Sequence, residues 1–181
     1  MTVTSPTLGI ENRPTAYAPY IKPWVPEKVR QPVYVRMDGM IHKLAVSHGP
    51  SECGYDVRLA ESVEIRAGYR ATPHGVTLEW VGMPLHLDAE VWGKSTYARL
   101  GVALNTTKVD PGFDGAVTIE MTWAPDWKGL LWHWRNVICP RRIVIPAGTG
   151  IATLVFNPLA AHADYRLKGK YGGSAGPEEA R

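Results

Sequence analysis

The chain has 181 residues, of which 45% are apolar and 20% are charged, and its formal net charge is +3. This composition is typical of a globular protein of one domain that is long enough to bury a substantial core. The mild charge, without a concentrated basic run, argues against nucleic-acid binding, and no apolar run is long enough to span a bilayer.

The two cysteines, Cys53 and Cys139, lie far apart and form no C-x-x-C pair. We therefore expect two reduced thiols, as in a cytoplasmic protein. The first residues, MTVTSPTLGIENRP, lack the apolar segment of a secretory signal, which favours the same location.

Residues 1–32 are rich in Pro, Tyr and Thr and have no clean hydrophobic periodicity. Between residues 16 and 32 the prolines are too closely spaced for a stable helix. We predict an arm whose aromatic side chains pack on a surface, with a neighbouring subunit as one candidate. The 15 prolines and 18 glycines of the chain indicate many turns and few long helices.

From Val33 onward, short alternating segments are separated by turn residues. Asp38-Gly39 is a hairpin signal, and a helical turn is predicted only at Lys94–Leu100. The predicted strands cover residues 32–37, 40–46, 55–59, 62–66, 77–81, 116–123, 141–145 and 150–156. Short strands at this spacing, without helices between them, predict an all-β sandwich or barrel.

A basic, hydroxyl-rich turn contains Gly93, Lys94, Ser95, Thr96 and Arg99. Glycine lets backbone N–H groups approach an anion, and two cations neutralise its charge, so the turn suits a polyanion. The N-terminus of the predicted helical turn would favour phosphate for the same reason. A P-loop is excluded, because position 88, where that loop requires glycine, holds Asp.

Residues 116–123 alternate between apolar and polar side chains. Val117, Ile119 and Met121 are predicted to face the core, and Thr118 and Glu120 to face the other side. A carboxylate in this position is a candidate proton donor and acceptor. It is also an ordinary residue for a solvated strand face, and the pattern alone leaves both interpretations open.

Three motifs, GKSTYARLG, VDPGFDGAVTIE and KGKYGG, resemble the dCTP deaminase branch of the dUTPase-like superfamily, as do SECGYDVRLA and TLEWVGMP upstream. The resemblance extends over Ser51–Gly173, with the motifs in the expected order. It implies a distorted jelly-roll-like β-barrel that assembles as a homotrimer with active sites between subunits. The chain would then consist of the arm at 1–32, a barrel domain at 33–164 and a flexible tail at 165–181 that covers the active site.

The resemblance implies that the enzyme deaminates dCTP by hydrolysis to dUTP and ammonia, with Glu120 as general acid and base. Ser95 would position the attacking water, and Arg99 would lie beside Glu120. The chain lacks the H-x-E and C-x-x-C motifs of zinc-dependent deaminases, which argues against a zinc site. Mg²⁺ is expected only on the phosphates of the substrate.

The implied substrate-binding residues are mostly polar or basic. They are Lys94, Ser95, Thr96, Arg99, Asp110, Thr118, Glu120, Thr153, Tyr165, Lys168 and Lys170. Lys94 replaces an arginine of many relatives, so a bidentate grip becomes a point charge. Asp110 would bind the sugar, although Asp before Pro-Gly is also ordinary turn chemistry. Thr153 replaces a glutamine, which would alter base recognition, and the three tail residues would cover the triphosphate and exclude water.

The alternatives at this point are a dUTP diphosphatase, a bifunctional enzyme that also hydrolyses dUTP to dUMP, and a deaminase of a modified deoxycytidine nucleotide. A trimeric binding module without catalysis is a further alternative, with the Trp-rich residues 123–134 as its contact surface. The enzymes share a small-molecule deoxynucleotide triphosphate as partner, with no nucleic acid and no membrane.

Overall fold

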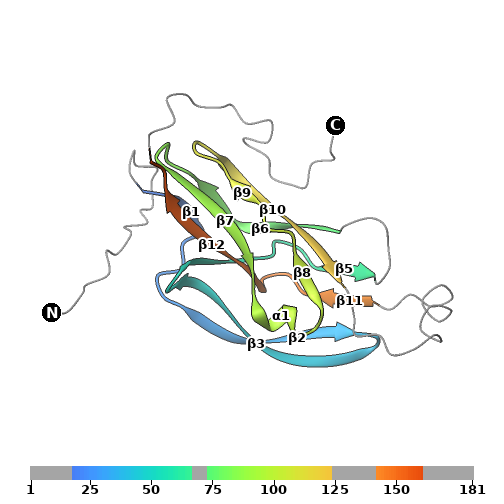
Figure 1. Ribbon diagram of the computed structural model, residues 1–181. Coiled ribbons are helices and arrows are strands. Elements are labelled where there is room, and N and C mark those ends of the chain that lie inside the picture. The colour runs from blue at the N-terminus through green and yellow to red at the C-terminus, as the bar shows by residue number, and fades with distance from the viewer. Residues whose placement is uncertain (1–17, 67–72, 124–141, 161–181) are drawn as a thin grey trace.

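The computed structural model describes residues 18–66, 73–123 and 142–160 (Figure 1). They form two antiparallel sheets and one short helix, which confirms the all-β prediction. One sheet has four strands in the order β1-β6-β10-β8, and the other has eight in the order β5-β11-β2-β3-β4-β12-β7-β9. The elements are β1 (Tyr20–Lys22), β2 (Val29–Met37), β3 (Met40–Ser51), β4 (Gly54–Arg58), β5 (Val63–Arg66), β6 (His74–Gly82), β7 (Leu87–Gly93), α1 (Ser95–Ala98), β8 (Val102–Leu104), β9 (Lys108–Val109), β10 (Asp114–Trp123), β11 (Arg142–Ile145) and β12 (Gly150–Pro158).

The larger sheet is curled rather than flat. In Figure 1 the β2–β3 hairpin curves along the lower side of the molecule, while β7 and β12 run diagonally to the upper left. β4 and β12 connect these two regions, because β4 pairs with β3 and with β12, and β12 pairs in turn with β7. The helix α1 follows β7 directly, so its position depends on this sheet.

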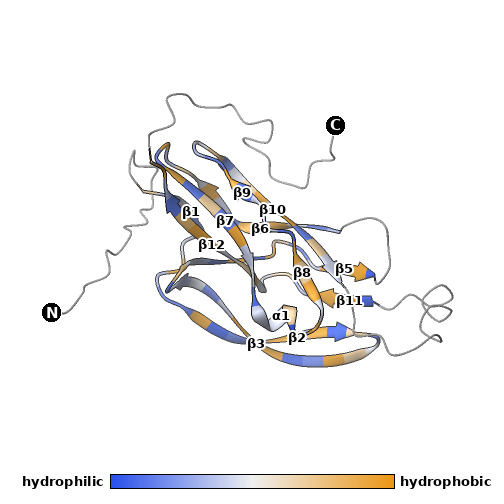
Figure 2. Cartoon of the chain, viewed as in Figure 1, coloured by the Kyte–Doolittle hydropathy of each residue, from blue (hydrophilic) through white to orange (hydrophobic). Residues whose placement is uncertain are grey.

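The core is built from alternate side chains of the strands. Val117, Ile119 and Met121 of β10 have exposed fractions of 5%, 1% and 0%, which confirms the predicted inward face of this strand. Figure 2 shows hydrophobic and hydrophilic residues following one another along the strands. Each fully buried aliphatic side chain contributes about 1.5–3 kcal/mol relative to an exposed one.

The β2–β3 hairpin confirms the turn predicted at Asp38-Gly39. The register runs without a break from Val29↔His48 to Met37↔Met40, which leaves a two-residue loop. Asp38 and Gly39 have φ values of 51° and 84°. Two left-handed residues are what a type I′ turn requires, and this turn matches the twist of the strands it joins.

Part of the predicted N-terminal arm belongs to the sheets. β1 pairs with β6, and Ile21 is fully buried. The ring of Trp24 stacks on Tyr55 at 5.0 Å, and the Val25 N–H donates to the Tyr55 hydroxyl over 3.1 Å. These residues therefore pack on the core of their own chain, and β2 begins already at Val29.

Strands β1, β7, β8 and β9 do not appear among the elements predicted from the sequence. β7 is the most consequential of them, because it pairs with β12 and β9 and leads into α1. Leu87, Ala89 and Val91 of β7 are buried, but Asp88 and Glu90 stand between them. Acidic residues and alanine are poor strand formers, so the alternation of this strand gives a weak signal.

Cys53 is exposed and free, whereas Cys139 lies outside the described residues. Within the part of the chain that the structure describes, no helix has the length and apolar character needed to cross a membrane.

Candidate functional site

The helical turn predicted at Lys94–Leu100 is confirmed as α1. Lys94 occupies the N-cap position, and its carbonyl accepts hydrogen bonds from the N–H groups of Tyr97 (3.0 Å) and Ala98 (3.2 Å). Tyr97 is fully buried, and its hydroxyl donates to the Gly150 carbonyl over 3.1 Å. Burial raises the pKa of Tyr97, so this hydroxyl keeps its proton. A single turn has only a small helix dipole, so anion binding here would depend mainly on side chains.

The side chains of this turn point to different sides. Ser95 and Arg99 are exposed, and Thr96 is partly buried. Lys94 instead points into the protein: its side chain is 11% exposed, and its Nζ lies 2.5 Å from Asp56 Oδ2. Burial lowers the pKa of Lys94, and Asp56 counteracts this effect.

Asp56 is the centre of a polar cluster that the sequence reasoning missed. Besides Lys94, its carboxylate accepts hydrogen bonds from Ser47 Oγ (2.7 Å) and Thr153 Oγ1 (2.6 Å), although Asp56 is only 2% exposed. The one available signal was a charged residue between Tyr55 and Val57, both fully buried, in the motif SECGYDVRLA. Two of the predicted substrate-binding residues, Lys94 and Thr153, are therefore brought together by a carboxylate that was not predicted.

Glu120 lies on β10, on the side opposite to the buried residues, and is partly exposed. Its Oε2 accepts a hydrogen bond from Asn105 Nδ2 over 3.1 Å, and its carbonyl accepts one from the Asn105 N–H, also over 3.1 Å. Thr118 occupies the same side of the strand two residues earlier. The polar side predicted for these two residues is thus the side that they occupy.

Arg99 and Glu120 lie at different points of the ladder between β8 and β10. Val102, shortly after α1, pairs with Trp123, the last residue of β10, whereas Glu120 precedes Trp123 by three residues, which is roughly 10 Å at the usual strand rise. The Trp123 indole Nε1 also donates to the Leu100 carbonyl over 2.8 Å, which places α1 at that end of the strand. Among the described residues no ion pair joins Arg99 to Glu120 in the single chain, so their proximity stays a prediction for a site shared between subunits.

Asp110 begins a tight turn after β9. Its carbonyl accepts a hydrogen bond from the Phe113 N–H over 3.1 Å, and Gly112 has a φ of 77°. With Pro111 in the second position, these features define a type II turn. Main-chain bonds between Met83 and both Gly112 and Phe113 hold the turn in place. The Asp110 carboxylate is left exposed at the surface.

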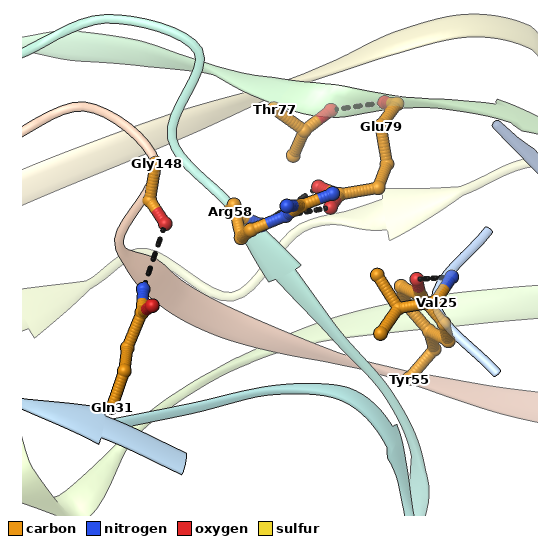
Figure 3. A network of polar contacts seen from close by, with 7 residues as sticks. All are labelled: Val25, Gln31, Tyr55, Arg58, Thr77, Glu79 and Gly148. Carbon is orange, nitrogen blue, oxygen red and sulfur yellow. Dashed lines mark hydrogen bonds and ion pairs between the residues drawn. The ribbon is translucent and has the colours of Figure 1, made fainter. Parts of the chain in front are cut away.

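A second buried charge pair joins the motifs SECGYDVRLA and TLEWVGMP. The carboxylate of Glu79, which is fully buried, accepts hydrogen bonds from the Arg58 N–H (2.7 Å) and from Arg58 Nε (2.6 Å). Figure 3 shows the two side chains directed toward one another, with the Thr77 hydroxyl on the carbonyl of Glu79. Burial raises the pKa of Glu79, and the bonds from Arg58 offset part of this effect.

The remaining predicted substrate-binding residues, Tyr165, Lys168 and Lys170, lie outside the described residues, as does most of the Trp-rich segment. No group of three or more His, Cys, Asp or Glu side chains gathers as a candidate metal site within residues 18–66, 73–123 and 142–160. The described site therefore consists of the α1 turn with its Asp56 cluster, the Asp110 turn and the polar side of β10.

Comparisons with known proteins show similarity to dCTP deaminases. A family model described as dCTP deaminase-like matches residues 74–126, a segment that includes α1, the Asp110 turn and Glu120. The dCTP deaminase of Herpetosiphon aurantiacus is 28% identical over 172 residues, covering 77% of this chain and 85% of that protein. The dCTP deaminase of Campylobacter jejuni is 32% identical over 109 residues, covering 45% and 59%.

Among solved structures, the native dUTPase of EIAV matches with a TM-score of 0.49 and 15% identity, covering 80% of this chain and 98% of that one. This likeness is too low to carry an argument. Residues 74–126 are thus similar to a dCTP deaminase-like family model, and the chain is similar to enzymes named dCTP deaminase. These matches agree with the branch that the motifs resemble.

Proposed function

We propose that the protein deaminates dCTP to dUTP and ammonia, with Glu120 as the general acid and base. The observation that carries the proposal is the position of Glu120 within the segment that matches the family model. This carboxylate stands on the polar side of a strand whose other side is buried, and one of its oxygens already has an amide donor in Asn105. A carboxylate that is fixed but accessible is what a proton-transfer group requires.

The reaction adds water to C4 of the cytosine ring and expels the 4-amino group. Glu120 takes a proton from the attacking water and passes it to N3 of the ring, as the C–O bond forms and C4 becomes tetrahedral. Glu120 then takes the proton of the new hydroxyl group and delivers it to the 4-amino nitrogen, so that the C4–N bond breaks, ammonia departs and the C4 carbonyl of uracil forms. One carboxylate can serve both transfers, because it gives up the first proton before it accepts the second.

The other assignments belong to the same proposal. Ser95 and Thr96, whose side chains are at least partly accessible, would contact water and phosphate, and the exposed Arg99 would meet Glu120 of a neighbouring subunit in a homotrimer. Asp110 would bind the sugar, and Thr118 and Thr153 would line the site. Tyr165, Lys168 and Lys170 would close over the triphosphate.

Mg²⁺ enters this proposal with the substrate. It retains much of its water shell and commonly binds through phosphate oxygens with few protein carboxylates. In the described residues, Asp110 offers an exposed carboxylate near the predicted site, whereas Asp56 is buried and paired. The metal would neutralise phosphate charge, which suits a turn with few cations.

The test is a nucleotide panel of dCTP, dCMP, CTP, dUTP and 5-substituted dCTP, assayed for ammonia and for pyrophosphate. Ammonia with dUTP from dCTP supports the proposal. Release of pyrophosphate and dUMP from dUTP, without ammonia, would instead identify a dUTP diphosphatase. Release of both ammonia and pyrophosphate from dCTP would identify a bifunctional enzyme. Ammonia released only from the 5-substituted nucleotide would identify a deaminase of modified deoxycytidine.

The Glu120→Gln variant tests the assigned residue. It should abolish ammonia release yet keep dCTP affinity within about tenfold, because the interaction that it loses is made mainly in the transition state. Binding is measured by calorimetry with dCTP. Thr122→Val serves as the control, since Thr122 is an exposed residue of the same strand. Undiminished deamination by Glu120→Gln would rule out the role given to this carboxylate.

A further inference from the structure

The ammonium group of Lys94, expected from the sequence to contact phosphate, is engaged inside the protein. Its Nζ lies 2.5 Å from Asp56 Oδ2 and 3.3 Å from Ser47 Oγ, and only 11% of the side chain is exposed. A lysine ammonium has three N–H donors. Two of them are used within the chain, and the positive charge is compensated before any substrate arrives.

Asp56 connects three separate parts of the fold. Its partners come from β3 (Ser47, 2.7 Å), from β12 (Thr153, 2.6 Å) and from the residue that begins α1 (Lys94). At 2% exposure the carboxylate depends on these donors, because a buried charge without partners is strongly destabilising. The start of α1 is therefore tied to the middle of the eight-stranded sheet.

A second attachment follows three residues later. Tyr97 is fully buried, and its hydroxyl donates to the carbonyl of Gly150 at the start of β12. A Cβ on Gly150 would come within 2.1 Å of the Ser47 carbonyl oxygen, so β12 approaches β3 closely at this position. Both attachments thus end on the same region of the sheet, and Ser95 and Thr96 lie between them in sequence.

We propose that Asp56 is a positioning residue, which through Lys94 fixes the orientation of Ser95 and Thr96, and that Lys94 is an internal brace rather than a phosphate ligand. This inference rests on the proposed function, since it assigns Ser95 and Thr96 to the deamination site. A turn held only at Tyr97 can rotate about that residue, whereas two attachments determine where the intervening hydroxyls point. Thr153 also donates its hydroxyl proton to Asp56, so the same carboxylate fixes the orientation of that hydroxyl.

The kinetic test compares Asp56→Asn, Lys94→Met and the double variant for ammonia release from dCTP and dCMP. Each single variant should lower kcat by about 10- to 100-fold, the usual effect of a small misplacement of reacting groups, while KM stays within about threefold. The preference for dCTP over dCMP should not change. The double variant should be no worse than either single one, because both remove the same interaction, and Lys94→Arg should recover part of kcat.

The matched control is the ion pair of Lys108, whose side chain is 59% exposed, with the buried Asp88, whose Oδ2 lies 2.8 Å from Lys108 Nζ. Lys108→Met and Asp88→Asn make the same chemical changes outside the proposed site and should leave kcat within about twofold. The contrary result is that Lys94→Met raises KM for dCTP and loses the preference for dCTP over dCMP, while Asp56→Asn does neither. Lys94 would then be a phosphate ligand, and the proposal would be overturned.

A second measurement does not depend on activity. For each of the two pairs, denaturant unfolding of the wild type, the two single variants and the double variant forms a double-mutant cycle. The unfolding constants should show a coupling of about tenfold between Asp56 and Lys94, and little coupling between Asp88 and Lys108. Additive effects for Asp56 and Lys94 would overturn the brace. A wild-type protein that releases no ammonia from any nucleotide contradicts the proposed function instead, and the unfolding cycle then still decides whether Asp56 holds the turn.

Discussion

At the scale of single residues, the buried pair of Arg58 and Glu79 gives the clearest prediction about stability. Glu79 is fully buried, and 17% of the Arg58 side chain is exposed. Glu79→Gln retains an oxygen that can accept the Arg58 N–H but leaves the guanidinium without a counter-charge. We expect the free energy of unfolding to fall by about 3–5 kcal/mol, as when one partner of a buried pair is removed. Urea denaturation measures this change.

The control for that prediction is the double variant Arg58→Met with Glu79→Gln, which leaves no buried charge and retains an acceptor for the main-chain N–H. It should recover most of the lost stability, because the penalty arises from the unpaired charge rather than from a missing contact. A double variant that is less stable than Glu79→Gln alone would mean that the pair stabilises the fold directly.

Asp88 gives a prediction of pH dependence. The hydrogen bond from Lys108 lowers the pKa of Asp88 below its ordinary value of 3.8. Its contribution to stability is therefore fully present above pH 3.8 and is lost as the pH falls through the lower, folded-state pKa. Asp88→Asn should be less stable than wild type at pH 6, by no more than about 1 kcal/mol because Lys108 is exposed, and the two proteins should converge in acid.

The convergence is measured by thermal unfolding between pH 6 and pH 2. Wild-type and Asp88→Asn proteins that differ by a constant amount over this whole range would show that Asp88 contributes through its shape and not through its charge.

At the scale of elements, Gly39 and Gly150 are glycines for two different reasons: a left-handed backbone at Gly39, and a close approach of another strand at Gly150. Gly39 has a φ of 84°, and a Cβ there would meet nothing within 4 Å. Gly39→Ala should therefore cost only the backbone strain, about 1–2 kcal/mol. At Gly150 the added Cβ would lie 2.1 Å from the Ser47 carbonyl oxygen. Gly150→Ala should cost about 3 kcal/mol or more, the upper end for overpacking.

Both costs are read from chemical denaturation of the two variants. Equal destabilisation by the two alanines would contradict the close approach of β12 to β3. A Gly39→Asn variant is the control for backbone strain, because asparagine tolerates the left-handed region better than alanine, and it should be more stable than Gly39→Ala.

The same elements show what the sequence could predict. The Asp38-Gly39 hairpin, the turn at Asp110 and the alternation of β10 depend on residues close together in the chain, and local patterns predicted them. The Asp56 cluster could not be predicted in this way. Its contact with Thr153 joins residues 97 positions apart, and the alternation of residues 55–59 assigns Asp56 to the polar side of its strand without indicating its burial or its partners.

At the scale of the whole molecule, two parts of the candidate site, the α1 turn and the polar side of β10, lie apart within one chain. The α1 turn carries Ser95 and Arg99, and the polar side of β10 carries Glu120, which has Asn105 and not Arg99 as its side-chain partner. A closed symmetric oligomer can bring such parts together by placing the same two surfaces of adjoining copies against one another. This is how the proposed homotrimer would complete each site.

Subunit mixing tests this arrangement. Arg99→Ala and Glu120→Gln homotrimers should each be nearly inactive, because each lacks one part of every site. In trimers reassembled from equal amounts of the two chains, an intact site needs Arg99 from a Glu120→Gln chain and Glu120 from the neighbouring Arg99→Ala chain. Random assembly around a closed ring produces this order of neighbours in about a quarter of the sites. Ammonia release from dCTP should thus return to about a quarter of the wild-type rate per site. If both residues instead serve within one chain, no mixture contains an intact site, and mixing restores nothing.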